Sequence, residues 1–281
     1  MLAAPAHVAT AAASPEALLA DPRLWRATSL GASSSPCVAS GFAALDAELP
    51  GGGWPTRMLS EILQPEPGLC EWRLLGPALG RLLQAPSAGA IGTAGAGRRR
   101  SAPAAQTRQL LLIKPPRQPH LPGLRALGIA PQQLVWIDPA DALQALWVTE
   151  QAIKANAAAA ILAWLPTARP PQIRRLQAAA LASAAPVFLF RPLAAQAQSS
   201  AAPLRLLLHP GADWTLQLQI LKRRGPAHAG ALQLSALPAE LAALLAPRLL
   251  RPSAPVPHHE VHHEPAVLAR PARARRQPSL A

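Results

Sequence analysis

The segment from Gln64 to Glu71 stands where a phosphate-binding loop would be expected. It follows an apolar run of strand character (58–63) and precedes a run of helical character (71–84), the context in which a phosphate cradle forms. A cradle needs glycines whose N–H groups converge on an anion, a lysine for the terminal phosphates and a serine or threonine for Mg²⁺. The loop here reads Gln64, Pro65, Glu66, Pro67, Gly68, Leu69, Cys70 and Glu71.

The composition of this loop argues against phosphate chemistry. It has a single glycine, neither lysine nor hydroxyl, and two prolines that have no N–H to donate. The carboxylate of Glu71 would also repel a phosphate about 4 Å away, by roughly 1 kcal/mol per charge pair in water and about 4 kcal/mol at a protein surface. We therefore predict a degenerate loop that binds no cofactor.

Two other groups of chemically active residues carry no better signal. The segment His259–His263 matches the metalloprotease pattern H-E-x-x-H, but it lies between Pro257 and Pro265 without an apolar face. A catalytic zinc would also need a third fixed ligand. Asp46 and Glu61 come without a lysine, Mg²⁺ ligands or a nucleophile. We predict no catalytic residue and no metal site.

Short apolar runs alternate with helical patterns along the middle of the chain, and these elements must position the loop. Fully apolar runs of four to six residues are typical of buried parallel strands, and a closing pair of runs with period 2 indicates an antiparallel hairpin. The predicted class is α/β, with a largely parallel sheet, helices on both faces and a terminal antiparallel hairpin. Strands are expected at 58–63, 110–113, 134–137, 160–164 and 187–190, the hairpin at 204–208 and 214–221, and helices at 71–84 (kinked or interrupted at Gly76-Pro77), 124–127, 140–156 and from Pro170 onward.

Length and composition predict one α/β domain of about 200 residues with tails. We expect a flexible N-terminal segment (1–36) with a short helix at 15–25, a core (37–250) with a low-complexity insertion (85–106), and a disordered Pro/His/Arg-rich tail (251–281). Two cysteines without metal spacing fit a reducing cytoplasm. We expect neither a signal peptide nor a membrane span, because no run of about 20 apolar residues is free of charge and proline.

The segment 41–55 carries a distinctive pattern, made by Gly41, Phe42, Leu45, Asp46, Leu49, Pro50, Gly51, Gly52, Gly53, Trp54 and Pro55. This pattern resembles the RecA-like core of the ImuA family of translesion-synthesis accessory proteins, and weaker matches at 134–139 and 160–164 extend the resemblance to roughly residues 20–245. In an active recombinase the strand at 160–164 would carry an aspartate that orients Mg²⁺, but here Leu165 and Pro166 follow Trp164. We expect the glycine turn and Trp54 to shape a docking surface.

This resemblance implies a non-enzymatic accessory role in the SOS response to DNA damage. It implies three partners: a Y-family-like polymerase homologue of the ImuB type, a replicative-type error-prone polymerase, and RecA itself. The chain has a net charge of +13, which favours anionic partners and non-specific DNA contact. The residues expected to contact DNA or a partner are Arg169, Arg174 and Arg175, at a loop that faces DNA in related cores, and Lys222, Arg223 and Arg224, at the end of a predicted strand.

Three other functions stay open at this point. A SulA-like inhibitor of cell division is also built on a reduced RecA-like core, but it would be shorter than this chain. A RecA/KaiC-type ATPase with a divergent phosphate loop would need nucleotide binding despite the two prolines. A plain nucleic-acid-binding module would show affinity that falls steeply with salt.

Overall fold

The structure is a computed structural model that describes residues 36–85 and 108–238 together with residue 242. Of the predicted domains, the core (37–250) falls largely within these residues. The predicted N-terminal helix (15–25), the insertion from residue 86 onward and the tail (251–281) lie outside them. None of the helices in the described ranges is long and apolar enough to cross a membrane.

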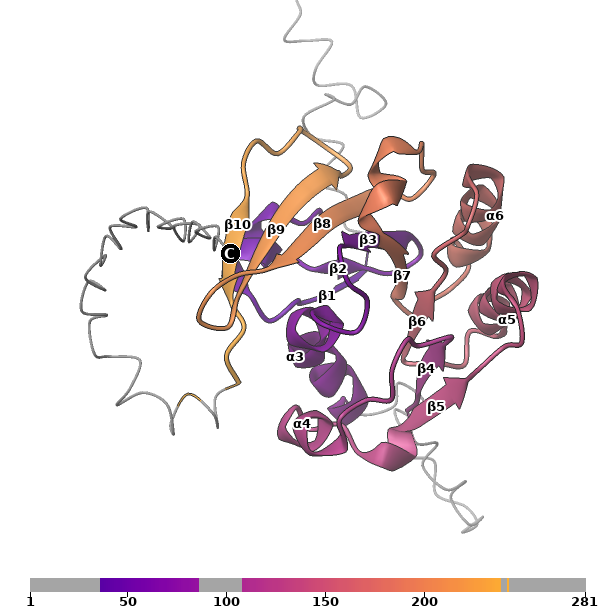
Figure 1. The fold of residues 1–281 in the computed structure, drawn as a ribbon, viewed down its shortest axis with the longest axis horizontal. Coiled ribbons are helices and arrows are strands. Elements are labelled where there is room, and N and C mark those ends of the chain that lie inside the picture. Colours follow the sequence, from indigo (N-terminus) through magenta and orange to yellow (C-terminus); the bar gives the residue numbers. More distant parts are fainter. Residues whose placement is uncertain (1–35, 86–107, 239–241, 243–281) are drawn as a thin grey trace, which may run out of the picture. The chain divides into compact units, whose positions relative to one another are not determined.

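Eight strands in the described part of the chain form one twisted sheet (Figure 1), in the order β10-β9-β8-β3-β7-β6-β4-β5. The strands from β8 to β5 are parallel to one another, and β9 and β10 add antiparallel pairs at one edge. This arrangement confirms the predicted α/β class, a RecA-like core, with its parallel sheet and terminal hairpin. The strands are β3 (Leu59–Gln64), β4 (Leu110–Ile113), β5 (Leu134–Ile137), β6 (Ala160–Trp164), β7 (Val187–Pro192), β8 (Leu204–Pro210), β9 (Thr215–Lys222) and β10 (Leu232–Ser235).

Helices cover both faces of the sheet (Figure 1), as predicted. Strand β6 shows why its sequence is apolar throughout: Leu162 and Trp164 belong to one core, and Ile161 and Ala163 belong to the other, because successive side chains point to opposite faces. The first face packs α2 (Ala43–Glu48), α3 (Glu71–Gln84) and α4 (Leu121–Ala126), and the second packs α5 (Ala142–Ala155) and α6 (Pro170–Ala180); the short 3-10 helices are η2 (Pro131–Gln133) and η3 (Leu193–Ala197).

The glycine-rich turn at 51–53 joins α2 to a two-residue strand, β2 (Trp54–Pro55), which pairs with β1 (Cys37–Val38). A Cβ atom on Gly53 would lie 2.4 Å from the carbonyl oxygen of Val38, so this close approach requires glycine. Trp54 is fully buried and packs edge-on against Phe188, with ring centroids 5.3 Å apart. The expectation that Trp54 shapes a docking surface is therefore wrong, because its indole is part of the core.

Helix α3 runs without a break from Glu71 to Gln84, so the interruption expected at Gly76-Pro77 does not occur. A residue before proline resists the helical conformation partly because its Cβ clashes with the proline ring, and glycine has no Cβ. The same position also faces α4 closely, since a Cβ on Gly76 would lie 2.5 Å from Leu127 Cδ1. The Gly76-Pro77 pair thus lets α3 continue unbroken and pack closely against the end of α4.

Helix α5 does not bury all of its regularly spaced apolar residues. Leu143 and Trp147 share helical spacing with Leu146 and Ile153, yet their side chains are 71% and 57% exposed. The residues that meet the sheet and α6 include Leu146, Glu150 and Ile153. Two large apolar side chains are left on the outer face of the helix.

A buried ion network at the centre of the sheet was not predicted. Glu61 on β3 is fully buried, and its carboxylate accepts hydrogen bonds from Arg191 Nη1 (2.8 Å) on β7 and from Arg205 Nε (3.0 Å) on β8. Both arginines are also buried, so one negative charge faces two positive charges in a region that water does not reach. Arg191 Nη2 also donates to the carbonyl oxygen of Ala168, and Arg205 Nη2 donates to that of Ala195.

Removing this carboxylate should destabilise the fold strongly. Glu61→Gln would leave two buried guanidinium groups without a counter-charge, and we expect the free energy of unfolding to fall by about 3–5 kcal/mol in urea denaturation. A loss below about 1 kcal/mol, the range of exposed pairs, would contradict the network's importance.

Glu150→Gln is the matched control, since Glu150 also pairs with two cations, Lys154 and Arg175, each at 2.8 Å, but both partners are largely exposed. We expect a loss of at most about 1 kcal/mol, because solvent screens the pair. The hydrogen bond from Lys154, together with Arg175 and against partial burial, lowers the pKa of Glu150 from its ordinary 4.5. The stabilisation by Glu150 is present above that value and is lost as the pH falls through the lowered pKa. The parent and Glu150→Gln should therefore differ in stability at pH 7 and converge once the pH lies below the lowered pKa.

Candidate functional site

A cleft of about 430 Å³ opens at the carboxyl ends of the parallel strands, where open α/β sheets bind their ligands. Its floor is the ring of Trp164 stacked on Phe190, with centroids 4.7 Å apart and an interplanar angle of 24°. Five prolines at the carboxyl ends of the neighbouring strands β3, β7, β6 and β4 line it, so much of the surface is apolar. The lining residues are Gln64, Pro67, Lys114, Pro115, Pro116, Asp138, Trp164, Pro166, Phe190, Arg191 and Pro192.

The degenerate loop beside this cleft folds around its own carboxylate. Glu71 is the first residue of α3 and is fully buried. Its Oε1 accepts hydrogen bonds from the backbone N–H of Gly68 (2.6 Å) and from the Gln64 side chain (2.6 Å), and its Oε2 accepts one from the N–H of Cys70 (3.1 Å). Backbone N–H groups at a helix N-terminus are the donors that bind a phosphate in nucleotide-binding proteins. Here an internal carboxylate occupies them.

The strand that lacks the expected aspartate contributes to the same contact. Trp164, the last residue of β6, donates its indole N–H to Glu71 Oε1 at 2.9 Å. Sequence reasoning treated the missing lysine of the loop and the missing acid of this strand as two separate losses. In the structure, the residues at both places form one hydrogen-bonded group.

The cations that line the cleft are each engaged in the fold. Lys114 adopts a left-handed backbone conformation (φ 55°) at the end of β4, and its ammonium group contacts Asp138 (3.0 Å) and the carbonyl oxygen of Pro139 (2.8 Å). Arg191 is held by Glu61, as described above. Neither group reaches toward the cradle around Glu71 in any hydrogen bond or ion pair of the described residues.

Cys70 is the other reactive side chain of the loop, and its environment makes it inert. Burial raises the pKa of its thiol to about 11; the nearby charge of Arg73 opposes this shift and that of Glu71 adds to it. The thiol is therefore protonated at neutral pH, and a thiol rather than a thiolate is a poor nucleophile and metal ligand. The described residues contain no group of three His, Cys, Asp or Glu side chains that could hold a metal ion, and the segment His259–His263 lies outside them.

The six residues predicted to contact DNA or a partner fall into two groups at opposite edges of the sheet. Arg169 is the N-cap of α6, which follows the carboxyl end of β6, and Arg174 and Arg175 lie in the middle of this helix. Lys222 is the last residue of β9 and lies opposite Arg205 in the β8–β9 ladder, near the amino ends of the parallel strands. Arg224 is exposed in the turn that follows. The structure therefore does not bring the two groups into one surface.

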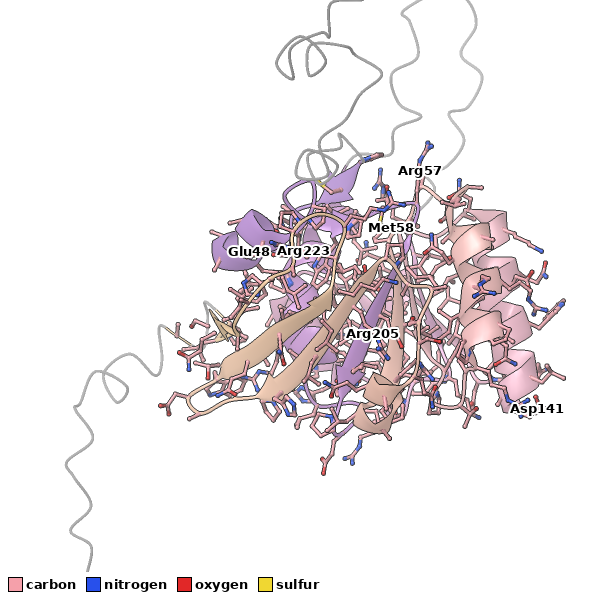
Figure 2. All side chains as sticks on the ribbon, turned by 90° about the horizontal axis from the view of Figure 1, so that it is seen from above. Glu48, Arg57, Met58, Asp141, Arg205 and Arg223 are labelled. Carbon is pink, nitrogen blue, oxygen red and sulfur yellow. The ribbon has the colours of Figure 1, made fainter. Side chains whose placement is uncertain are left out.

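Arg223 has a structural partner. It donates to the Glu48 carboxylate at 2.7 Å and to the Glu48 carbonyl oxygen, which joins the end of β9 to α2. Figure 2 shows this pair at the end of the sheet where Arg57 and Met58 precede β3, with Asp141 at the opposite end. Of the second basic group, Lys222 and Arg224 keep the greater exposure.

Sequence reasoning missed a second cleft, of about 600 Å³, between the N-terminal ends of α5 and α6. It shares Lys114, Trp164 and Pro166 with the first cleft, so the two adjoin along the carboxyl edge of the sheet. The apolar residues at the start of α5 were the available signal, since Leu143 and Leu146 both line this cleft.

The fold and these clefts define the class as an α/β protein with a RecA-like core. No protein-family model matches the chain, and no curated protein matches its sequence.

The internal carboxylate should be a measurable source of stability. Glu71→Gln would replace one carboxylate oxygen by an amide NH₂, which is itself a donor. At least one buried N–H would then lose its acceptor, so we expect the free energy of unfolding to fall by about 1–3 kcal/mol in urea denaturation. Glu66→Gln, at an exposed position of the same loop, should change stability by no more than about 0.5 kcal/mol. Equal effects of the two variants would show that the carboxylate does not organise the loop.

Proposed function

We propose that this chain is a non-catalytic RecA-like accessory protein of the SOS response that supports translesion synthesis in the cytoplasm. The observation that carries the proposal is the Glu71 carboxylate, which accepts four donors at the place where a RecA-like ATPase would hold phosphate. A core that keeps its sheet order and fills its own phosphate site needs no nucleotide to be folded. Such a core suits assembly with other proteins better than catalysis.

The resemblance of the segment 41–55 to the ImuA family supplies the partners in this proposal: a Y-family-like polymerase homologue of the ImuB type, a replicative-type error-prone polymerase, and RecA. The retained RecA-like shape supports pairing with RecA subunits or capping of their filament. The exposed basic residues Arg169, Arg174, Lys222 and Arg224 are candidates for non-specific DNA contact beside these partners.

The first test separates this proposal from an ATPase with a divergent loop. Mg²⁺-ATP should leave the melting temperature unchanged, because Glu71 holds the N–H groups that a phosphate would need. A nucleotide present at 100 times its dissociation constant would stabilise the fold by about 2.7 kcal/mol, which a thermal shift assay detects readily. A reproducible upward shift with Mg²⁺-ATP would favour the ATPase.

The second test addresses the partners directly. Purified protein should co-precipitate with RecA on single-stranded DNA and change the rate at which the filament hydrolyses ATP. Absence of both effects would remove RecA pairing and filament capping from the proposal. Co-sedimentation with the tubulin-like division protein, without any effect on RecA, would favour the SulA-like function instead.

A further inference from the structure

An apolar ridge lies on the outer face of α5 with no partner in the described residues. Leu143 and Trp147 are spaced four residues apart, so their side chains neighbour each other on the helix surface. Single exposed apolar residues are ordinary, whereas contiguous apolar surface marks interaction sites. Whether these two side chains belong to a larger apolar surface therefore decides whether they indicate an interaction site.

Leu143 also lines the second cleft, which makes the ridge and the cleft one surface. The cleft has about 600 Å³ of space between the first turns of α5 and α6, enough for several side chains of a partner. Figure 2 places Asp141, the N-cap of α5 and a lining residue, at this end of the helical layer. We call this surface the α5 groove; its members are Leu143 and Trp147 with the cleft residues Ala142, Ala145, Leu146, Leu165, Pro166, Thr167, Ala168, Arg169 and Gln172.

The charges around the α5 groove favour an acidic partner. Asp141 caps α5, accepting from the Gln144 N–H at 2.7 Å, and its negative charge offsets one cation of this surface. Glu150 is shared by two cations, Lys154 and Arg175, which leaves one positive charge in excess. Arg169 lines the groove, and its guanidinium has no carboxylate partner among the described residues.

The rest of this chain does not supply an acidic segment. Residues 251–281 carry five arginines against two glutamates, and residues 239–250 carry one arginine and one glutamate. Residues 86–107 carry three arginines and no acid, and residues 1–35 are neutral. A second copy of the groove would present the same positive charge. The complementary segment must therefore come from another protein.

We propose that the α5 groove binds an acidic amphipathic helix of a partner protein. Apolar side chains at i, i+4 spacing on that helix pack against Leu143 and Trp147 and enter the cleft, and its carboxylates face Arg169 and the excess charge beside Glu150. A nucleic acid fits less well, because a phosphate backbone would leave Leu143 and the apolar cleft uncovered. The inference deepens the proposed function and rests on it for the existence of a protein partner.

The test is a display selection of random helical 16-residue peptides against the full-length protein. The double variant Leu143→Gln/Trp147→Gln removes the ridge, and Leu181→Gln is the matched control, an equally exposed leucine at the far end of α6 (56% exposed). Both variants should melt like the parent, because the changed side chains lie at the surface.

The selection should enrich acidic peptides with apolar residues at i, i+4 spacing on the parent and on Leu181→Gln, and should fail on the double variant. For an enriched peptide, fluorescence anisotropy should give an affinity at least about tenfold weaker for the double variant, since a buried tryptophan contact is a typical hot spot. Arg169→Glu should weaken binding as well, and added salt should do the same for the parent.

The proposal is overturned by no enrichment, by enrichment of peptides without the acidic and apolar pattern, or by equal binding of an enriched peptide to the parent and the double variant. Loss of affinity for a labelled 20-nucleotide single strand in the double variant, without peptide enrichment, would assign the surface to nucleic acid. Failure of the proposed function can be distinguished from failure of this inference. If only the proposed function is wrong, the peptides bind as described but RecA and the polymerases do not bind. If those partners bind the double variant as tightly as the parent, the proposed function stands and this inference fails.

Discussion

The carboxylate of Glu61 sits in the middle strand of the sheet and holds a guanidinium from each neighbouring strand, Arg191 on β7 and Arg205 on β8. Three charges in a dry interior are tolerable only when every one of them has close partners. The surplus positive charge is met by oxygen atoms of the connections that follow β6 and β7: the carbonyl of Ala168, the side chain of Gln198, and the carbonyls of η3. One buried carboxylate thereby fixes three strands and two loops.

This constraint reaches the carboxyl edge of the sheet. The carbonyl of Ala168 is held by Arg191, and the next residue, Arg169, begins the approach to α6 and lines the second cleft. On the other face, Glu71 fixes the loop before α3 by accepting four donors, one of them the indole of Trp164. The two buried carboxylates have no contact partner in common. Each nevertheless restricts a loop that in a nucleotide-binding protein would move with its ligand.

Most strands of the sheet could be predicted from the sequence alone, but few of the side-chain contacts could. Strands β4 and β6 have the predicted bounds because a strand buried on both faces must be apolar throughout, and such runs are short and easily recognised. The partners of Glu61 are separated from it by 130 and 144 residues, and pairing at that distance depends on strand order. The buried face of α5 could not be predicted for a different reason. Leu143 and Trp147 have helical spacing with each other, as Leu146 and Ile153 do, and hydrophobicity does not say which pair meets the sheet.

Trp164 connects the loss of phosphate chemistry to the proposed gain of a binding surface. Its indole N–H satisfies Glu71, its ring stacks on Phe190, and it lines both clefts of the carboxyl edge. An aspartate at this end of β6 would need a metal or another donor, whereas tryptophan supplies a donor to the internal carboxylate and apolar area to the clefts. The same holds for Pro67 of the loop, which has no N–H group for a phosphate and lines the first cleft. The residues that surround the internal carboxylate thus also supply apolar surface at the edge of the sheet where we propose that another protein binds.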